Sequence, residues 1–333
     1  MRLAYWSTVL GLGWILLAGC DGGQREDVLV VYSAGPRPVA EDIVAAFSRE
    51  TEADVELFAA TTGQVMARLE AERYRPRADV VIFASRVAAE ALKQDQRLLR
   101  YPEPSWLSET EADWHDPEHY YFATSAALVG MAFRESVYDE DADWGRFLSP
   151  DPGLRMTMPS PSRSGAAGDL VVSLVLDRGD AIWPELLDAR GAGLDFAAAN
   201  SQAISTTLVG AFDGILGAVD YLIFSQIADG APLVVHYPPS GSALVERPIA
   251  ILASTPNEEL SRRFVDYYFC REAQERVAAA HLLPARPDVA VSDIRGSREL
   301  PELLERDIEA ALKQQTRILR RFQLEVERAE IVR

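Results

Sequence analysis

The chain has 333 residues, of which 48% are hydrophobic and 25% charged, so it is long enough to bury a core and to form two domains. Its formal net charge of -18 argues against nucleic acid as a partner, because phosphate backbones are bound by clustered Lys and Arg and no such run occurs. Only two cysteines and four scattered histidines are present, which predicts neither a disulfide nor a zinc site.

The N-terminus predicts an export signal. Arg2 precedes an apolar run at 3–17 that is shorter than the ~20 residues of a spanning helix and ends in "LAGC". This tetrapeptide resembles the lipobox of bacterial lipoproteins, which implies a signal peptide over 1–19, acylation of Cys20, a polar leader over 20–27, and inner-membrane retention through Asp21. An ordinary secretory signal with a chance cysteine is the alternative. The other cysteine, Cys270, is expected to be a buried and inert thiol.

From residue 28 the chain alternates short apolar runs with amphipathic segments, which is the pattern of an α/β fold. The elements predicted in order are a strand at 28–35, a helix at 37–50, a strand at 53–63, a helix at 64–72 and a strand at 78–85. Two βαβ units of this kind need parallel strands. Their strand-to-helix loops then share one sheet edge, where ligands bind in open α/β sheets.

A loop-rich stretch separates these units from a second domain. The apolar run at 120–133 predicts a strand that crosses into that domain, and the run at 246–254 predicts a return strand. Between them, a strand at 154–158 leads through "PSRSGAAGD" into a helix at 170–176. The residues from Leu300 onward predict a charged amphipathic helix that docks on its own domain.

Three loops have the same design, in which a strand ends, small or hydroxyl residues follow and a helix begins. They are Ser33-Ala34-Gly35, Thr61-Thr62-Gly63 and Ser164-Gly165. Free N–H groups and the helix dipole attract anions at such helix starts, although Ser and Thr are also ordinary helix caps. The recurrence of the design in both domains favours loops that face one cleft.

A serine hydrolase is not predicted. The loop around Ser164 lacks the leading glycine of a nucleophile elbow, and the only histidine in the second domain's core pattern, His236, lies in a strand-like segment. We therefore expect no enzyme activity and no cofactor.

The order and spacing of several segments resemble the periplasmic substrate-binding proteins of ABC importers, in the branch that includes iron(III)-, 2-aminoethylphosphonate- and sugar-phosphate-binding members. The segments that carry the resemblance are "VLVVYSAG", "FSRETEADVELFAATTGQVMARLEAE", "RADVVIFAS", "PSRSGAAGD" and "YPPSGSALVERPIAILASTPNEELSRRFVDYYFCREAQERVA". The resemblance implies a type II clamshell of two α/β lobes, each a mixed sheet flanked by helices, joined by crossing strands. It places lobe I at 28–123 and 247–299, lobe II at 124–246 and a C-terminal helix at 300–333.

The ligand implied by the resemblance is an anion. The iron-binding branch uses an adjacent tyrosine pair where this chain has Asp220-Tyr221. This difference weakens the case for ferric iron as the bound solute but does not eliminate it. A phosphate or phosphonate head is expected instead, with Arg163 or Arg37 as charge partner and Asp220 accepting from an amine or sugar hydroxyl, or serving only as a helix cap. The complete set of predicted ligand-binding residues is Ser33, Ala34, Gly35, Thr61, Thr62, Gly63, Ser162, Ser164, Gly165, Asp220 and Tyr221.

The sequence thus predicts a monomeric, lipid-anchored, periplasm-facing protein that captures a small organophosphate or phosphonate and delivers it to an ABC permease. Two alternatives remain open. One is a ferric-iron-binding transport protein of the same family, with Asp220 and Tyr221 as metal ligands. The other is a sensor that presents its liganded form to a membrane kinase.

Overall fold

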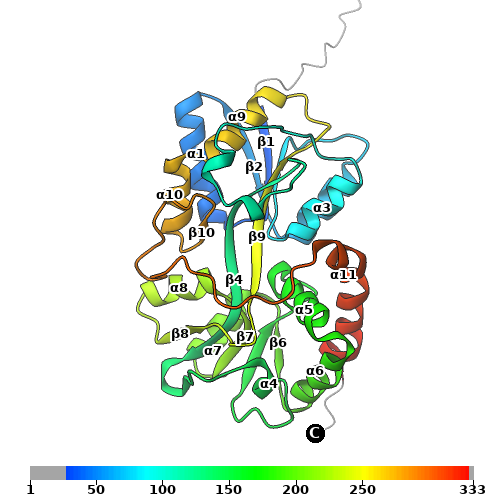
Figure 1. Ribbon diagram of the computed structural model, residues 1–333, viewed down its shortest axis with the longest axis vertical. Coiled ribbons are helices and arrows are strands. Elements are labelled where there is room, and N and C mark those ends of the chain that lie inside the picture. Colours follow the sequence, from blue (N-terminus) through cyan, green and yellow to red (C-terminus); the bar gives the residue numbers. More distant parts are fainter. Residues whose placement is uncertain (1–27, 330–333) are drawn as a thin grey trace, which may run out of the picture.

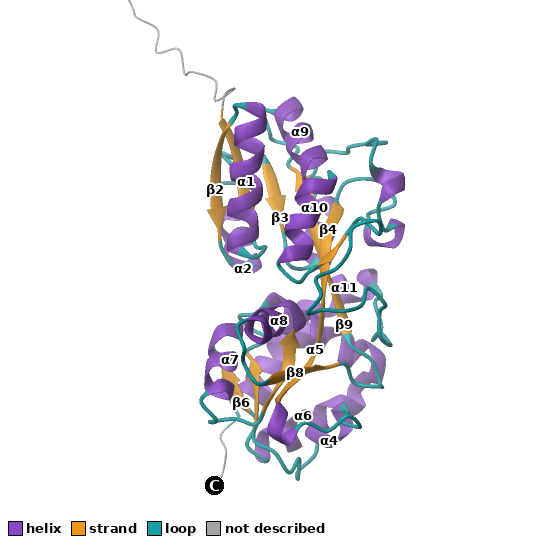
Figure 2. Ribbon diagram, turned by 90° about the vertical axis from the view of Figure 1, so that its left-hand side faces the viewer, coloured by secondary structure: helices purple, strands orange, loops and turns teal. Residues whose placement is uncertain are grey.

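A computed structural model describes residues 28–329 of the chain. The predicted signal peptide, Cys20 and the polar leader all lie outside these residues. Figures 1 and 2 show two lobes, one above the other, linked by long strands that run through both. No helix among residues 28–329 is long and apolar enough to span a bilayer.

The strands of both lobes form one continuous sheet in the order β2-β1-β3-β9-β4-β7-β5-β6, with β8 and β10 also paired to β4. Their bounds are β1 Val28–Ser33, β2 Asp54–Ala59, β3 Val80–Ile82, β4 Phe122–Arg134, β5 Met156–Pro159, β6 Asp195–Ala197, β7 Gly214–Val219, β8 Leu233–His236, β9 Ala243–Ile251 and β10 Leu283–Pro284. β1 is parallel to β2 and β3, and β5 is parallel to β6 and β7, while β9 and β4 run antiparallel to their neighbours. Each lobe therefore has a mixed sheet.

Helices cover the sheets in both lobes (Figure 1). Their bounds are α1 Arg37–Thr51, α2 Thr62–Ala71, α3 Arg86–Gln94, α4 Trp144–Phe147, α5 Gly165–Arg178, α6 Ile182–Gly191, α7 Asn200–Leu208, α8 Asp220–Ala228, α9 Glu258–Tyr268, α10 Arg271–Ala279 and α11 Ile308–Phe322. Short helical turns occur at η1 Leu107–Glu109, η2 Ala112–Trp114, η3 Glu135–Val137, η4 Gly179–Ala181 and η5 Gln323–Glu327.

Local sequence explains why these segments adopt their structures. β1 is apolar at consecutive positions because a parallel strand is covered on both faces, and all but its first residue are buried. In α1 the buried residues Val39, Ile43, Ala46 and Phe47 recur every three or four positions, which places them on one face against the sheet. The predicted βαβ units of lobe I are thereby formed.

β4 and β9 are the strands that cross between the lobes. β4 pairs with β9 from Phe122 to Val129 and with β7 from Val129 to Phe133. Every residue of β9, and every residue of β4 except the last, is buried. The predicted lobe boundaries at 123/124 and 246/247 fall inside these two strands.

The C-terminal segment differs in detail from its prediction. The helix expected from Leu300 begins at Ile308, where the Asp307 side chain accepts from the Ala310 N–H at 2.8 Å. The residues just before it are extended, and Leu303 pairs with Ser242 at the start of β9. Cys270, expected to be buried, is only partly so. Its sulfur accepts from the Ala273 N–H at the start of α10, and burial raises the pKa of its thiol.

Candidate functional site

A cleft of about 600 Å³ lies between the two lobes. Lobe I contributes residues from the ends of β1, β2 and β3, lobe II contributes the loops that follow β5, β6 and β7, and β9 contributes Arg247. This is the carboxyl edge of the parallel strands, where the backbone turns from strand to helix and leaves polar groups free. The lobes approach each other closely here, since a Cβ atom added at Gly165 would lie 3.7 Å from the Thr62 hydroxyl oxygen.

The N-termini of three helices, α2, α5 and α7, line the cleft. The first N–H groups of a helix have no partner within it, and the dipole makes this end positive. Side-chain caps satisfy some of these groups. Thr61 accepts from the Gln64 N–H at 3.3 Å, and Ser164 accepts from the Ala167 N–H at 3.3 Å. The remaining N–H groups at the starts of α2 and α5 provide donors for an anion from both lobes.

Arg247 gives the cleft a positive side chain. It is 4% exposed, and neither an ion pair nor a side-chain hydrogen bond joins it to another residue within 28–329. Its guanidinium carbon lies 5.1 Å from the centre of the Tyr221 ring, which also lines the cleft. A buried guanidinium without a carboxylate is costly, so its position favours an anion that completes the pair.

The structure places most of the predicted site residues in this lining. Those present are Ala34, Thr61, Thr62, Gly63, Ser162, Ser164, Gly165 and Tyr221. Those absent from it are Ser33, Gly35 and Asp220. The loop pattern therefore located the cleft, although the roles of individual side chains differ from the prediction.

Ser33 is fully buried, and its hydroxyl oxygen accepts from the Gly35 N–H at 3.1 Å. This bond shapes the turn after β1, and Ser33 does not belong to the cleft lining. Ser162 does line the cleft, but its hydroxyl donates to the carboxylate of Glu327 at 2.7 Å. Thus Ser33 and Ser162 stabilise loops through their hydroxyls.

Asp220 is the largest departure from the prediction that it accepts from a ligand amine or hydroxyl. Its side chain is 0% exposed and forms an ion pair with Arg295 at 2.6 Å. The same carboxylate accepts from the Tyr237 hydroxyl at 3.0 Å and from the Tyr221 N–H at 2.6 Å. Burial raises the pKa of Asp220, and the Arg295 guanidinium opposes that shift. With these partners, Asp220 is an internal structural group.

Sequence reasoning missed Arg247 and Asn200. The Asn200 amide donates to the Ser164 hydroxyl at 3.4 Å, while its amide oxygen is buried without a partner among the described residues. The signal for Arg247 was present, because the pair Glu246-Arg247 interrupts an otherwise apolar strand. Arg37 and Arg163, the predicted charge partners, differ in position: Arg163 lines the cleft and Arg37 does not.

The side chains of the lining define what the cleft can bind. Tyr221 supplies a phenol, Arg163 and Arg247 supply positive charge, and no carboxylate, imidazole or thiol belongs to the described lining. The adjacent tyrosine pairs Tyr120-Tyr121 and Tyr267-Tyr268 do not belong to the described lining, and Tyr121, Tyr267 and Tyr268 are buried. The donor set suits an anion better than a bare hard cation, which prefers several anionic oxygen ligands.

Two α/β lobes on crossing strands, with an interlobe cleft lined by helix N-termini, define a periplasmic binding protein fold of type II. The profile of the bacterial extracellular solute-binding protein family matches residues 28–282, and the chain belongs to this family. It is therefore a non-catalytic solute-binding protein of ABC-type transport that acts outside the cytoplasmic membrane. Comparison with curated protein sequences gives no match.

Solved structures share the fold at low sequence identity. The periplasmic binding protein AfuA from Actinobacillus pleuropneumoniae, with exogenous fructose-6-phosphate bound, is 17% identical over 90% of this chain and 99% of its own, with a TM-score of 0.80. Iron-bound HitA from Pseudomonas aeruginosa is 17% identical over 89% and 99%, with a TM-score of 0.78. The apo ferric ion-binding protein A of Pasteurella haemolytica is 15% identical over 92% and 100%, with a TM-score of 0.81.

Proposed function

We propose that this protein is the solute-binding component of an ABC importer for an organic phosphate or phosphonate. The head group of the solute binds between the N-termini of α2 and α5 and pairs with Arg247. The solute thereby contacts both lobes and favours their closed arrangement, which is the form that a permease recognises.

The observation that carries this proposal is the state of Arg247. It is buried in the cleft lining, and its guanidinium forms neither an ion pair nor a side-chain hydrogen bond with any residue in 28–329. An anionic oxygen pair fits the planar donors of a guanidinium in two parallel hydrogen bonds. The unpartnered amide oxygen of Asn200 adds an acceptor for a hydroxyl or amine elsewhere on the solute.

Ferric iron is the competing cargo within the family. The described lining offers it one phenol, from Tyr221, because the adjacent Asp220 is turned inward to Arg295. A single anionic oxygen ligand is a poor site for a hard trivalent ion. This difference in donor chemistry favours the phosphate or phosphonate.

A thermal-shift panel tests the proposal, using inorganic phosphate, 2-aminoethylphosphonate, hexose phosphates and ferric citrate. A solute at 100 times its dissociation constant adds about 2.7 kcal/mol to the free energy of unfolding. Arg247→Met is expected to weaken the binding of the active phosphorylated compound by at least about tenfold, the loss of one charge-assisted contact. Arg37→Met is the matched control, because Arg37 lies outside the lining and pairs with Glu41 at the surface.

Two results would overturn the proposal. One is stabilisation by ferric citrate alone, accompanied by a charge-transfer colour that Tyr221→Phe abolishes. The other is binding of a phosphorylated compound with equal affinity in the wild type and Arg247→Met.

Attachment to the membrane is a separate part of the proposal. We propose that a lipid on Cys20 keeps the protein beside its permease, on the evidence of the "LAGC" sequence. Metabolic labelling with a clickable fatty acid is expected to mark the wild type and to leave Cys20→Ser unlabelled. Labelling of both forms, or of neither, would contradict this attachment.

A further inference from the structure

The C-terminal part of the chain forms a structure that we call the strap, defined as residues 286–322. Figure 1 shows the chain leaving β10, passing in front of β4 and reaching α11 on the other side of the molecule. The family profile ends at residue 282, before the strap begins. The strap therefore adds contacts to the two-lobed fold that the matched segment does not contain.

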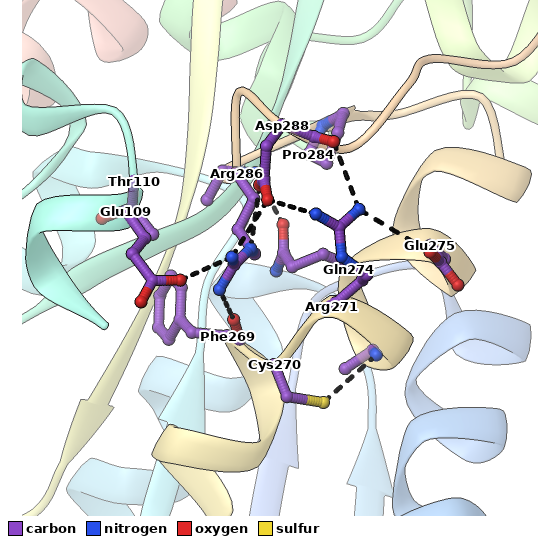
Figure 3. A network of polar contacts seen from close by, with 12 residues as sticks. Glu109, Thr110, Phe269, Cys270, Arg271, Gln274, Glu275, Pro284, Arg286 and Asp288 are labelled. Atoms are coloured by element: carbon purple, nitrogen blue, oxygen red, sulfur yellow. Dashed lines mark hydrogen bonds and ion pairs between the residues drawn. The ribbon is translucent and has the colours of Figure 1, made fainter. Parts of the chain in front are cut away.

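The strap starts from a charged anchor on lobe I. Arg286 pairs with Asp288 at 3.0 Å and with Glu109 at 2.5 Å, and Arg271 of α10 pairs with the same Asp288. Figure 3 shows these side chains converging beside the start of α10, where Arg286 also donates to the Phe269 carbonyl at 3.4 Å. This network holds the beginning of the strap against lobe I.

The next residues of the strap contact both lobes in turn. Arg295, with a side chain that is 3% exposed, pairs with Asp220 at the start of α8 in lobe II. Only three residues later, Arg298 pairs with Glu111 at 2.9 Å and donates to the Pro284 carbonyl at 2.8 Å, both in lobe I. A short segment that contains a turn thus ties one lobe to the other by charged hydrogen bonds.

The strap then contacts the crossing strand β9. Ser242 donates its N–H to the Glu302 carbonyl at 2.9 Å and accepts from the Leu304 N–H at 3.0 Å. Arg306 pairs with Glu246, which is 3% exposed and is also 3.5 Å from Arg86 of lobe I. These contacts lie on a strand that connects the lobes, where a hinge motion changes the backbone.

The final part of the strap, α11, packs against α3 of lobe I and α5 of lobe II. Between these helices, the Ser85 hydroxyl of lobe I donates to Asp169 of lobe II at 3.1 Å, and Gln315 of α11 donates to the same oxygen at 3.4 Å. Asp169 lies one helical turn after Gly165, which lines the cleft. Asp220 is likewise adjacent to the cleft residue Tyr221.

We propose that the strap is a conformational element that holds the two lobes together across the crossing strands and limits how far they open when no solute is bound. The fraction of molecules in the binding-competent arrangement sets the apparent affinity, so a strap of this kind also sets how tightly the cleft binds its solute. Asp220, at the position of a metal ligand in the iron-binding branch, serves here to anchor the strap.

The test compares interlobe distances in the ligand-free protein, so its outcome is independent of the identity of the solute. Fluorophores are attached through non-natural amino acids at positions 74 in lobe I and 209 in lobe II, where Tyr74 and Val209 are 96% and 81% exposed. The double variant Arg298→Met, Arg306→Met loosens the strap and leaves the buried Arg295–Asp220 pair intact. Glu246 retains Arg86 as a partner in this variant. Lys313→Met with Arg317→Met is the matched control, because Lys313 pairs with Glu309 and Arg317 donates to Gln314, both within α11.

The strap variant is expected to raise the ratio of open to closed molecules about three- to tenfold, the effect of losing two ion pairs made by partly exposed arginines in a two-state equilibrium. Ser85→Ala, which removes the hydrogen bond from lobe I to Asp169, is expected to shift the ratio in the same direction. Distance distributions that match the control in both variants would overturn the proposal. Loss of solute binding in Arg247→Met with unchanged interlobe distances leaves the strap supported and concerns the cleft alone.

Discussion

Replacing Arg295 by methionine leaves the carboxylate of Asp220 buried without its cation. The two side chains are 3% and 0% exposed, and their charged atoms lie 2.6 Å apart. Methionine also removes the cation–π contact with Phe224, whose ring centre lies 5.1 Å from the guanidinium carbon. The perturbation is therefore mainly electrostatic.

The magnitude follows from the burial of the pair. Breaking a buried ion pair by removing one partner costs about 3–5 kcal/mol, because the remaining charge is uncompensated. Asp220 keeps the Tyr237 hydroxyl and the Tyr221 N–H as donors, so we expect a loss near the lower end, about 3 kcal/mol. At about 2 °C per kcal/mol for a chain of this length, the midpoint of thermal unfolding falls by about 6 °C.

The assay is a double-mutant cycle followed by circular dichroism or calorimetry. Arg295→Met, Asp220→Asn and the double variant are compared with the wild type at pH 7. The double variant is expected to be more stable than Arg295→Met, because no buried charge remains. Arg298→Met is the control for loss of an arginine from the same segment, and its partly exposed pair with Glu111 predicts a cost below about 1 kcal/mol.

The pH dependence provides a second readout. Burial already raises the folded-state pKa of Asp220, and removal of Arg295 raises it further, above the unfolded value. The folded variant then binds a proton more readily than the unfolded chain, so the deficit of Arg295→Met shrinks as the pH falls through the folded pKa. A deficit that equals that of Arg298→Met, or a double variant whose cost is the sum of the single ones, would refute this reasoning.

Three further predictions concern other buried groups. Burial and the nearby Glu246 raise the pKa of Asp169 to about 7, so folding stability falls as the pH rises from about 4 to about 7. Urea titrations should therefore find Asp169→Asn more stable than the wild type by about 2–4 kcal/mol at pH 8. Near pH 4 the two proteins should differ little in stability. Burial lowers the pKa of His115 to about 4, so stability falls as the pH drops from about 6.5 to about 4, and His115→Asn should remove up to about 3 kcal/mol of that acid sensitivity, with a slope identical to wild type as the contrary result. An alanine at Gly130 would place its Cβ 2.6 Å from the backbone carbonyl of His236, which predicts a loss of about 1–3 kcal/mol by chemical denaturation; unchanged stability would show that β4 and β8 separate freely.

Much of the fold follows from local pattern. The apolar run of β1, the three- and four-residue spacing in α1 and the small residues after β5 each report a constraint that acts within about ten positions of the chain. Ser164 illustrates the point, because its place between an apolar strand and an apolar helix predicts both a cap and a cleft residue. It caps α5 through the Ala167 N–H and also lines the cleft.

The sequence predicted several of the residues that line the cleft, and their role in binding stays a prediction. Thr62 and Gly165 belong to loops whose pattern marks helix starts, and parallel strands bring such starts to one edge. Arg247 carries no such local mark beyond an acidic neighbour in an apolar strand. Its value as an anion partner depends on the fact that no carboxylate of the described fold pairs with it, which is a property of the surroundings.

Asp220 illustrates the difference between what the sequence determines and what only the tertiary structure decides. By itself, the sequence determined that a carboxylate precedes Tyr221, and it predicted a charged C-terminal helix. The partner of that carboxylate, Arg295, is 75 residues further along. Only the tertiary structure decided that the strap returns across the crossing strands and buries this pair, because pairing of distant charges depends on how the lobes and the strap pack and leaves no periodic trace in the chain.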